Sequence, residues 1–315
     1  MGELRNIAKE AGSIIITGHK RPDGDCIGAC IATYHYLNSI YPDKNIKVYL
    51  ENMPSRFAFL DPGMEIVSTE LPSGKFDLFI AFDCSAPDML GMAGSLFSSS
   101  KVTVCIDHHI SNKGYAGRNI IDPGASSTCE VLYGLMDEES ISKDAAEAIY
   151  TGIAFDTGIF SYSNTSKKTM EIAGNLMDKG ISFWDDIDRC FYQRTYTQTQ
   201  LLGRTLLTSM LLMDGKCIVA TITKRMMEFY GASLEDVEGI IEQLRITKGV
   251  EVAILLYETE KQEYKVSLRS NKYIDVSKIA KYFGGGGHIK AAGFTMRGSA
   301  YDVINNITEH IEMQL

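Results

Sequence analysis

The sequence predicts an α/β protein, in which a mainly parallel, doubly wound sheet domain and a smaller C-terminal α/β domain are joined by a helical linker. Three observations favour this class. Short apolar runs alternate with helical patterns in the first part of the chain, a helical polar stretch follows, and further apolar runs begin near residue 214. We expect domains at residues 1–190 and 214–315, with the linker at 191–213.

The first domain is predicted from four buried strands and the helices between them. SIIITGH has the pattern of a strand that enters a loop, and CIGACIATYHYLNSI has that of a helix. Strands separated by helices form parallel sheets that are covered on both faces, and their ligands gather at the carboxyl ends of the strands. The expected strands are residues 13–19, 45–51, 76–83 and 101–107, and the expected helices are 26–40 and 146–158.

The linker and the second domain show a different order of patterns. Residues 165–210 are helical and polar to mixed, which is typical of a bridge between domains. From residue 214 onward, KCIVATIT, VEVAILLYE and EYKVSLRS predict three strands, with helices between and after them. The second domain is therefore expected to be a smaller α/β unit.

The composition is that of an ordinary globular protein. Hydrophobic residues make up 45% and charged residues 23% of the 315 residues. No apolar run approaches the ~18 residues of a membrane span, and the N-terminus lacks the pattern of a signal peptide. The seven cysteines are odd in number and form no CxxC pair, which favours reduced thiols. We expect a cytoplasmic protein with no membrane partner.

The charge distribution bears on the partners of the protein. The net charge is −9, and residues 1–194 carry all of the excess acid, whereas residues 261–297 form a basic stretch. An acidic domain repels long polyanions unless bound cations neutralise it. We therefore expect no long nucleic acid as a partner. The basic stretch suits an anionic group, although charge alone is equally consistent with chance surface variation.

Polar clusters lie at or near the ends of predicted elements of the first domain. Carboxylates and imidazoles together suit divalent cations such as Mn²⁺. Each residue taken singly has an ordinary alternative, such as a helix cap or a satisfied core group, but their coincidence favours a metal site. Adjacent histidines on a strand end point in opposite directions, so only one of the pair is expected to bind metal. The residues are His19, Asp23, Asp25, Asp83, Asp107, His108, His109 and Asp156.

These motifs resemble the DHH phosphoesterase family, which is named for the motif that stands here at residues 107–109. GHKRPDGDCIGA, FDCS and GIAFDTG match further motifs of that family. FGGGGHIKAAGF at 283–294, preceded by SLRS at 267–270, resembles the signature of the DHH-associated C-terminal domain. The likeness covers nearly the whole chain, with the motifs in the expected order.

The resemblance implies a site for two divalent metal ions, with Mn²⁺ as the expected identity. It assigns one ion to His19, Asp23 and Asp83. It assigns the other to Asp25, Asp83, His108 and Asp156, so that Asp83 bridges the two. The expected catalytic residues are Asp107, which would orient a histidine, and His109, which would face the scissile phosphate.

The resemblance also implies a substrate-binding role for the second domain. A run of glycines from Gly284 to Gly287 can let backbone N–H groups approach a phosphate, and neighbouring side chains can add charge and hydrogen bonds. A flexible hairpin is the ordinary alternative for such a run. The expected substrate-binding residues are Arg269, Ser270, Gly285, Gly286, Gly287 and His288.

Family members with this layout resemble oligoribonucleases that act on very short RNA, and some also remove the 3′-phosphate of adenosine 3′,5′-bisphosphate (pAp). We therefore expect a hydrolase of short linear oligoribonucleotides and pAp. A cyclic di-AMP phosphodiesterase, a manganese pyrophosphatase-like enzyme and a non-catalytic nucleotide-binding module remain as alternatives. The sequence leaves homodimerisation open.

Overall fold

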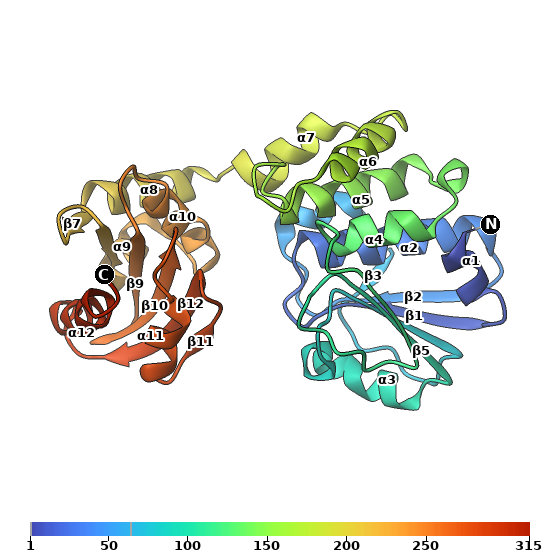
Figure 1. Ribbon diagram of the computed structural model, residues 1–315, viewed down its shortest axis with the longest axis horizontal. Helices are drawn as coiled ribbons and strands as arrows, with labels where there is room; N and C mark the ends of the chain where they lie inside the picture. The colour runs from blue at the N-terminus through green and yellow to red at the C-terminus, as the bar shows by residue number, and fades with distance from the viewer. Residues whose placement is uncertain (1, 64) are drawn as a thin grey trace. The chain divides into compact units, whose positions relative to one another are not determined.

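The computed structural model describes residues 2–63 and 65–315. The chain divides into two compact units, Met1–Gln193 and Arg194–Leu315. Each unit has its own sheet and its own buried core (Figure 1). The prediction of two successive α/β bodies is confirmed.

The sheet of the first unit has six parallel strands in the order β3-β2-β1-β4-β5-β6. The chain runs outward from β1 to β3 and then returns to the other side of β1 with β4, so the strand order reverses between β1 and β4. Ligands of such sheets bind outside the carboxyl ends of the strands at this reversal. The strands are β1 Ser13–Thr17, β2 Asn45–Tyr49, β3 Val67–Ser68, β4 Leu78–Phe82, β5 Val102–Asp107 and β6 Arg118–Ile121.

Both faces of this sheet are buried. Ile14 and Ile16 of β1 pack into the core on one face, whereas Ile15 packs into the core on the other. This explains why the central strands are continuous apolar runs rather than alternating patterns. Most helices cover the first face and α3 covers the second (Figure 1); they are α1 Glu3–Ala8, α2 Gly24–Ile40, α3 Gly94–Ser99, α4 Thr128–Leu135, α5 Lys143–Asp156, α6 Lys167–Met177 and α7 Phe183–Ile187.

Helices α2 and α5 pack closely because glycines lie at their contact. A Cβ atom at Gly28 would collide with the carbonyl oxygen of Ala148, and one at Gly152 would collide with the Cys129 sulfur. The start of α2 lies beside the end of α5, since a Cβ at Gly24 would meet the ring of Phe155. The antiparallel arrangement therefore brings the N-terminus of α2 next to the C-terminus of α5.

The second unit is built on a mixed six-stranded sheet in the order β11-β12-β10-β9-β8-β7. Helices α11 and α12 cover one face, and α8 and α10 cover the other. The strands are β7 Met210–Leu212, β8 Cys217–Ile222, β9 Val252–Glu260, β10 Glu263–Ser270, β11 Gly286–Gly287 and β12 Ala291–Arg297. The helices are α8 Tyr196–Leu207, α9 Lys224–Tyr230, α10 Ile240–Arg245, α11 Val276–Tyr282 and α12 Ala300–Glu312.

Most of the segment expected to be a helical linker, from residue 194 onward, is part of the second unit. Helix α8 buries Leu201 in the core of that unit, and residues 210–212 form the edge strand β7 rather than a helix. Strands β3, β6, β7, β11 and β12 were not predicted from the sequence. Strands β3, β7 and β11 have only two or three residues, which show no periodicity. Strands β6 and β12 are longer, but no apolar run like those of the central strands marks them. Among the described residues, no helix combines the length and the apolar character needed to cross a bilayer.

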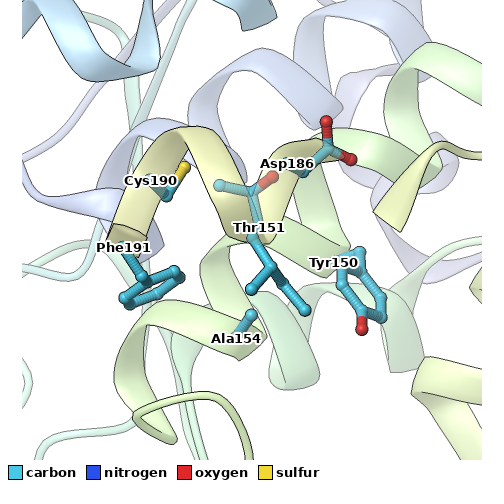
Figure 2. Close-up of a pocket in the computed structure, with 7 residues that line it drawn as sticks. Tyr150, Thr151, Ala154, Asp186, Cys190 and Phe191 are labelled. Carbon is cyan, nitrogen blue, oxygen red and sulfur yellow. The ribbon is translucent and has the colours of Figure 1, made fainter. Parts of the chain in front are cut away.

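A shallow crevice lies between α5 on one side and α7 with the turn that follows it on the other (Figure 2). Its lining includes Tyr150, Thr151, Cys190 and the carboxyl group of Asp186. None of the lining residues belongs to the predicted metal ligands. Asp186 is 2% exposed, and burial together with the nearby Glu147 carboxyl raises its pKa to about 7.

This buried carboxyl gives a testable effect on stability. Because the pKa of Asp186 is higher in the folded chain than in the unfolded chain, ionisation destabilises the fold as pH rises toward 7. Asp186→Asn removes that charge, so it should increase the free energy of unfolding more at pH 8 than at pH 5, by more than about 1 kcal/mol. Urea denaturation at both pH values measures this difference.

The matched control is Asp185→Asn, which removes the same charge at a partly exposed neighbouring position. This control should change stability almost equally at the two pH values. An Asp186→Asn variant that is no more stabilised at pH 8 than at pH 5 would show that Asp186 is already neutral or well solvated in the folded protein.

Candidate active site

The predicted metal ligands converge at the carboxyl edge of the first sheet. His19 follows β1, Asp83 follows β4 and His108 follows β5, and these three strands are neighbours. Asp25 lies in the first turn of α2, and Asp156 is the last residue of α5. The close packing of α2 on α5 thus adds two carboxylates to the three strand ends.

Asp83 lies at the centre of this cluster. Its carboxylate oxygens are 3.4 Å from Nε2 of His19 and 3.7 Å from Nε2 of His108. The side chain is buried, and the backbone has a φ of 57°, in the left-handed region that non-glycine residues rarely adopt. Strained conformations of this kind persist where the surrounding structure holds them, and they concentrate at functional sites.

Two further groups of side chains meet around Asp83. His19 Nε2 lies 3.8 Å from the Asp23 carboxylate, and Asp23 also caps α2 by accepting hydrogen bonds from the N–H groups of Asp25 and Cys26. His108 Nε2 lies 3.1 Å from the Asp156 carboxylate. Side chains that could bind metal form three groups, and within each group the ligand atoms lie within 4.8 Å of one another. The groups are Asp83, His108 and His109; His19, Asp23 and Asp83; and Asp25, His108 and Asp156.

Asp25 is fully buried and also supports helix α4. Its two carboxylate oxygens accept hydrogen bonds from the N–H groups of Thr128 at 2.6 Å and Cys129 at 2.9 Å, in the first turn of that helix. The Thr128 hydroxyl donates to Asp83 at 3.2 Å. Helix α4 therefore fixes the positions of two carboxylates, a role of Thr128 that no sequence motif indicated.

Asp107 holds the loop that carries the two histidines. One oxygen accepts hydrogen bonds from the N–H groups of His108 and His109, and it lies 2.8 Å from Nδ1 of His109. The other oxygen accepts a 2.7 Å hydrogen bond from the amide of Asn112. Asn112 was not predicted, because an asparagine in a loop has no distinctive pattern. Asp107 is completely buried and orients His109.

The prediction that the two histidines point in opposite directions is wrong. Their ring centroids are 4.7 Å apart, and both rings approach Asp83. Strand β5 ends at Asp107, so both histidines lie in a turn where strand alternation no longer applies. The Asp107 carboxylate, which binds both of their N–H groups, stabilises this turn. His108 is the more buried and His109 the more exposed of the pair.

The electrostatics of the cluster fit a site for cations. Burial opposes the charged form of both histidines, yet hydrogen bonds to Asp23 and Asp83 raise the pKa of His19 to about 11. A hydrogen bond to Asp156 similarly raises the pKa of His108 to about 10. Burial and the neighbouring carboxylates also raise the pKa values of Asp25 and Asp156. Crowded carboxylates whose ionisation is opposed in this way fit bound divalent cations, which prefer these oxygen and nitrogen ligands.

In the second unit, the predicted substrate-binding residues Arg269 and Ser270 face opposite sides of β10. Arg269 is partly exposed, and its Nε donates a 2.6 Å hydrogen bond to Glu242 of α10. Ser270 is 4% exposed, and its hydroxyl donates to the buried Glu251. Because successive residues of a strand project from opposite faces, one ligand cannot meet both side chains. In this conformation Ser270 holds Glu251 and does not face solvent.

The glycine run offers fewer free N–H groups than predicted. Gly284 has a φ of 78°, and the N–H groups of Gly284 and Gly285 bond to Lys281 and Ala280, which terminates α11. Gly286 and Gly287 pair with β12, and a Cβ at Gly285 or Gly287 would collide with that strand. The glycines thus serve a helix end and a close strand contact.

One N–H of the run is left at the edge of the sheet. His288 and Ala291 exchange two backbone hydrogen bonds, so the adjacent pair of Gly287 and Ala292 is a non-hydrogen-bonded pair. Strand β11 is the edge strand, and the Gly287 N–H therefore points away from β12. This N–H and the exposed His288 side chain are available to a ligand.

Comparison with known proteins agrees with the division of the chain into two units. Residues 13–153 match the DHH family, N-terminal domain, and residues 214–315 match the DHHA1 domain. The chain contains a DHH domain followed by a DHHA1 domain. The DHH match contains the sheet and the metal-ligand residues except Asp156, which lies three residues beyond it, and the DHHA1 match contains the glycine run.

Three relatives cover most of the length of this chain. It is 29% identical over 92% of its chain to the bifunctional oligoribonuclease and PAP phosphatase NrnA of Thermus thermophilus, 86% of which is covered. It is 28% identical over 89% of its chain to the protein of the same name from Bacillus subtilis, 88% of which is covered. The crystal structure of an exopolyphosphatase-related protein from Bacteroides fragilis has a TM-score of 0.90 at 26% identity, covering 98% of this chain and 94% of its own.

The central position of Asp83 gives a prediction for metal binding. Asp83→Ala removes a ligand from two of the three groups, so it should reduce bound Mn²⁺ from about two ions per chain to less than one. Metal analysis after gel filtration measures the stoichiometry. The control is Asp122→Ala, an exposed carboxylate that follows the neighbouring strand β6 and belongs to none of the groups. Equal metal content in the two variants would contradict this arrangement of ligands.

Protons and metal should compete for the DHH cluster. At pH 7 His19 and His108 are protonated in the metal-free protein, because their pKa values are about 11 and about 10. A metal ion must displace such protons, so Mn²⁺ affinity should rise roughly tenfold per pH unit for each displaced proton. Calorimetry at pH 7 in PIPES and in Tris measures proton release. A binding enthalpy that is the same in both buffers would contradict displacement.

Proposed function

We propose that this protein is a metal-dependent phosphoesterase that hydrolyses short oligoribonucleotides, such as pApA, and the 3′-phosphate of pAp. The observation that carries the proposal is the convergence of His19, Asp83, His108 and three further carboxylates at the carboxyl edge of the first sheet. The relatives named as oligoribonuclease and PAP phosphatase support the choice of substrate class.

The ligand set fits two divalent ions, and we propose Mn²⁺ because imidazole and carboxylate ligands are mixed. The first ion would be held by His19, Asp23 and Asp83, and the second by Asp25, Asp83, His108 and Asp156. When bound, such a pair of ions activates water as a nucleophile and stabilises the charge that gathers on the phosphoryl oxygens. Helix α4 keeps Asp25 and Asp83 in position through Cys129 and Thr128.

His109 is the proposed contact with the reacting phosphate. Its Nδ1 lies 2.8 Å from Asp107, and this carboxylate raises the pKa of the imidazole. The hydrogen bond to Nδ1 leaves Nε2 free to donate a proton to an anionic oxygen. The ring is 41% exposed, so a phosphate can reach it. Asp107 therefore holds both the orientation and the protonation of His109.

The second unit is proposed to select the substrate. His288, Arg269 and the edge N–H of Gly287 are the groups that we assign to substrate anions. The DHHA1 match over residues 214–315 argues against the pyrophosphatase alternative, whose second domain differs. All seven cysteines are unpaired, which supports a reducing cytoplasmic location.

A substrate panel tests the proposed function. Turnover of pApA and pAp should require Mn²⁺ and should disappear with EDTA, because the proposed nucleophile is water activated by the bound ions. Chromatographic detection of AMP measures both reactions, with cyclic di-AMP and pyrophosphate as competing substrates. The Asp83→Ala variant is the negative control. Faster hydrolysis of pyrophosphate or of cyclic di-AMP than of pApA and pAp would reject the proposed substrate class.

A further inference from the structure

Helix α5 ends at the proposed metal ligand Asp156, and the chain turns back soon after it. Residues 158, 159 and 160 have φ values of 55°, 56° and 60°, in the left-handed region. Glycine adopts this conformation readily, but Ile159 and Phe160 do not. Three such residues in succession persist only where the surrounding structure holds them. The segment after Asp156 is therefore strained and is held in place by its contacts.

The buried Thr157 holds this left-handed turn against α5. Its hydroxyl donates a 2.6 Å hydrogen bond to the carbonyl of Ile153 and accepts one of 3.0 Å from the N–H of Phe160. Its carbonyl accepts hydrogen bonds from the N–H groups of Ser161 and Tyr162, both at 2.9 Å. These contacts fold the chain back, so that the residues after the turn return to the end of the helix.

The side chain of Asn164 joins the end of α5 to the start of α4. Its NH₂ group donates a 3.1 Å hydrogen bond to the carbonyl of Asp156 and a 2.9 Å hydrogen bond to the carbonyl of Ser126. Both partners are acceptors, so this end of the side chain is the amide nitrogen rather than the oxygen. Ser126 directly precedes Ser127, the N-cap of α4. One side chain therefore connects the backbone of a metal ligand with a helix that lies 38 residues away in the sequence.

Ser126 is itself firmly anchored. Its hydroxyl donates a 2.7 Å hydrogen bond to the carboxylate of Glu130, and the hydroxyl of Thr169 in α6 donates to the same oxygen at 2.7 Å. Ser126 and Glu130 are each 1% exposed. Buried polar groups that are paired in this way have little freedom to move. Asn164 therefore ties the end of α5 to a fixed point in the first unit.

The same end of α4 positions the two other carboxylates that we assign to the second ion. Its first N–H groups bind Asp25, and the hydroxyl of Thr128 binds Asp83. Asp156 is the third carboxylate, and Asn164 links its backbone to this end of α4. Like charges at short distance repel one another, so three carboxylates stay together only where the scaffold holds them or a cation binds them. The contact of Asn164 opposes the movement of Asp156 away from the other two.

Another asparagine of the same unit has a purely local role. The side-chain oxygen of Asn119 accepts hydrogen bonds from the N–H groups of Tyr115 and Ala116, and its amide donates to the carbonyl of Ala116. These three hydrogen bonds close one loop of five residues. Asn164 differs because its two contacts join separate elements and one of them is made with a metal ligand, which favours a role in the geometry of the site.

Resting on the proposed function, we propose that Asn164 is a positioning residue for the second metal ion, because its amide sets the place of Asp156 relative to Asp25 and Asp83. The amide binds the backbone of Asp156 and leaves the carboxylate free for the ion. Asp156 also contacts His108 at 3.1 Å, but that contact joins two ligand side chains and must change when the ion binds. Loss of a partner that orients a metal ligand lowers metal affinity by about 10- to 100-fold. The first ion has no proposed ligand on α5 and should bind as before.

The test is a calorimetric titration of the full-length protein with Mn²⁺. Wild type should bind two ions, and Asn164→Ala should weaken one of them by about tenfold or more while the other keeps its Kd. Asn164→Asp, which keeps the size of the side chain but loses the NH₂ donors, should weaken the same ion at least as much. Asn119→Ala, the matched control, removes three hydrogen bonds and should bind both ions as wild type does.

A double-mutant cycle separates positioning from general support of the fold. In Asp156→Ala protein, the Mn²⁺ that still binds should be held equally with and without Asn164→Ala, because the ligand that Asn164 positions is gone. A further loss of affinity in the double variant, or equal weakening of both ions together with a lower Tm in Asn164→Ala, would show that Asn164 only supports the fold. An Asn164→Ala variant that binds both ions with wild-type Kd values would also overturn the proposal.

Turnover of pApA and pAp by wild type is measured beside the titrations, so that the two proposals fail separately. If wild type binds two ions, loses one selectively in Asn164→Ala and hydrolyses neither substrate, the proposed substrate class fails and the role of Asn164 stands. If wild type hydrolyses pApA and the two ions respond equally to Asn164→Ala, only the role of Asn164 fails. Fewer than two ions bound by wild type would overturn both.

Discussion

The Asp83 carboxylate is within 3.7 Å of side-chain nitrogens of His19, His108 and His109, at the end of β4. Its backbone takes up a left-handed conformation there, and its N–H bonds to the carbonyl of Ile106 in the next strand. A buried carboxylate is costly unless it is paired, so the surrounding imidazoles and the Thr128 hydroxyl are needed to hold it. The groups that follow the three strands are therefore arranged around this one position.

The helices place the remaining carboxylates around that centre. Parallel strands alone would provide groups from β1, β4 and β5, but Asp25 and Asp156 belong to helix ends. They reach the cluster because Gly28 and Gly152 allow α2 and α5 to approach more closely than side chains would permit. The packing of two helices therefore determines part of the ligand set of a site that is located by the sheet.

In the second unit, strand pairing separates residues with structural roles from residues available to a ligand. Ser270 and Glu251 order the turn after β10, because Glu251 accepts hydrogen bonds from the N–H groups of residues 272–274. Arg269 and His288 share the opposite face, next to Arg245. Most glycines of the run either end α11 or allow the close contact with β12. The remaining N–H of the run, the His288 side chain and the Arg269 guanidinium are the groups that we propose to hold an anion.

The sequence by itself determined the fold class, the main strands to within a few residues, and the polar clusters at their ends, because burial on both faces and strand alternation with helices leave strong local patterns. Only the tertiary structure decided the left-handed turn at Asp83, the shared direction of His108 and His109, and the meeting of Glu242 with Arg245 and Arg269. These features depend on contacts between segments far apart in the chain, or on turns in which the two-residue period of a strand has ended. Local pattern carries no information about either.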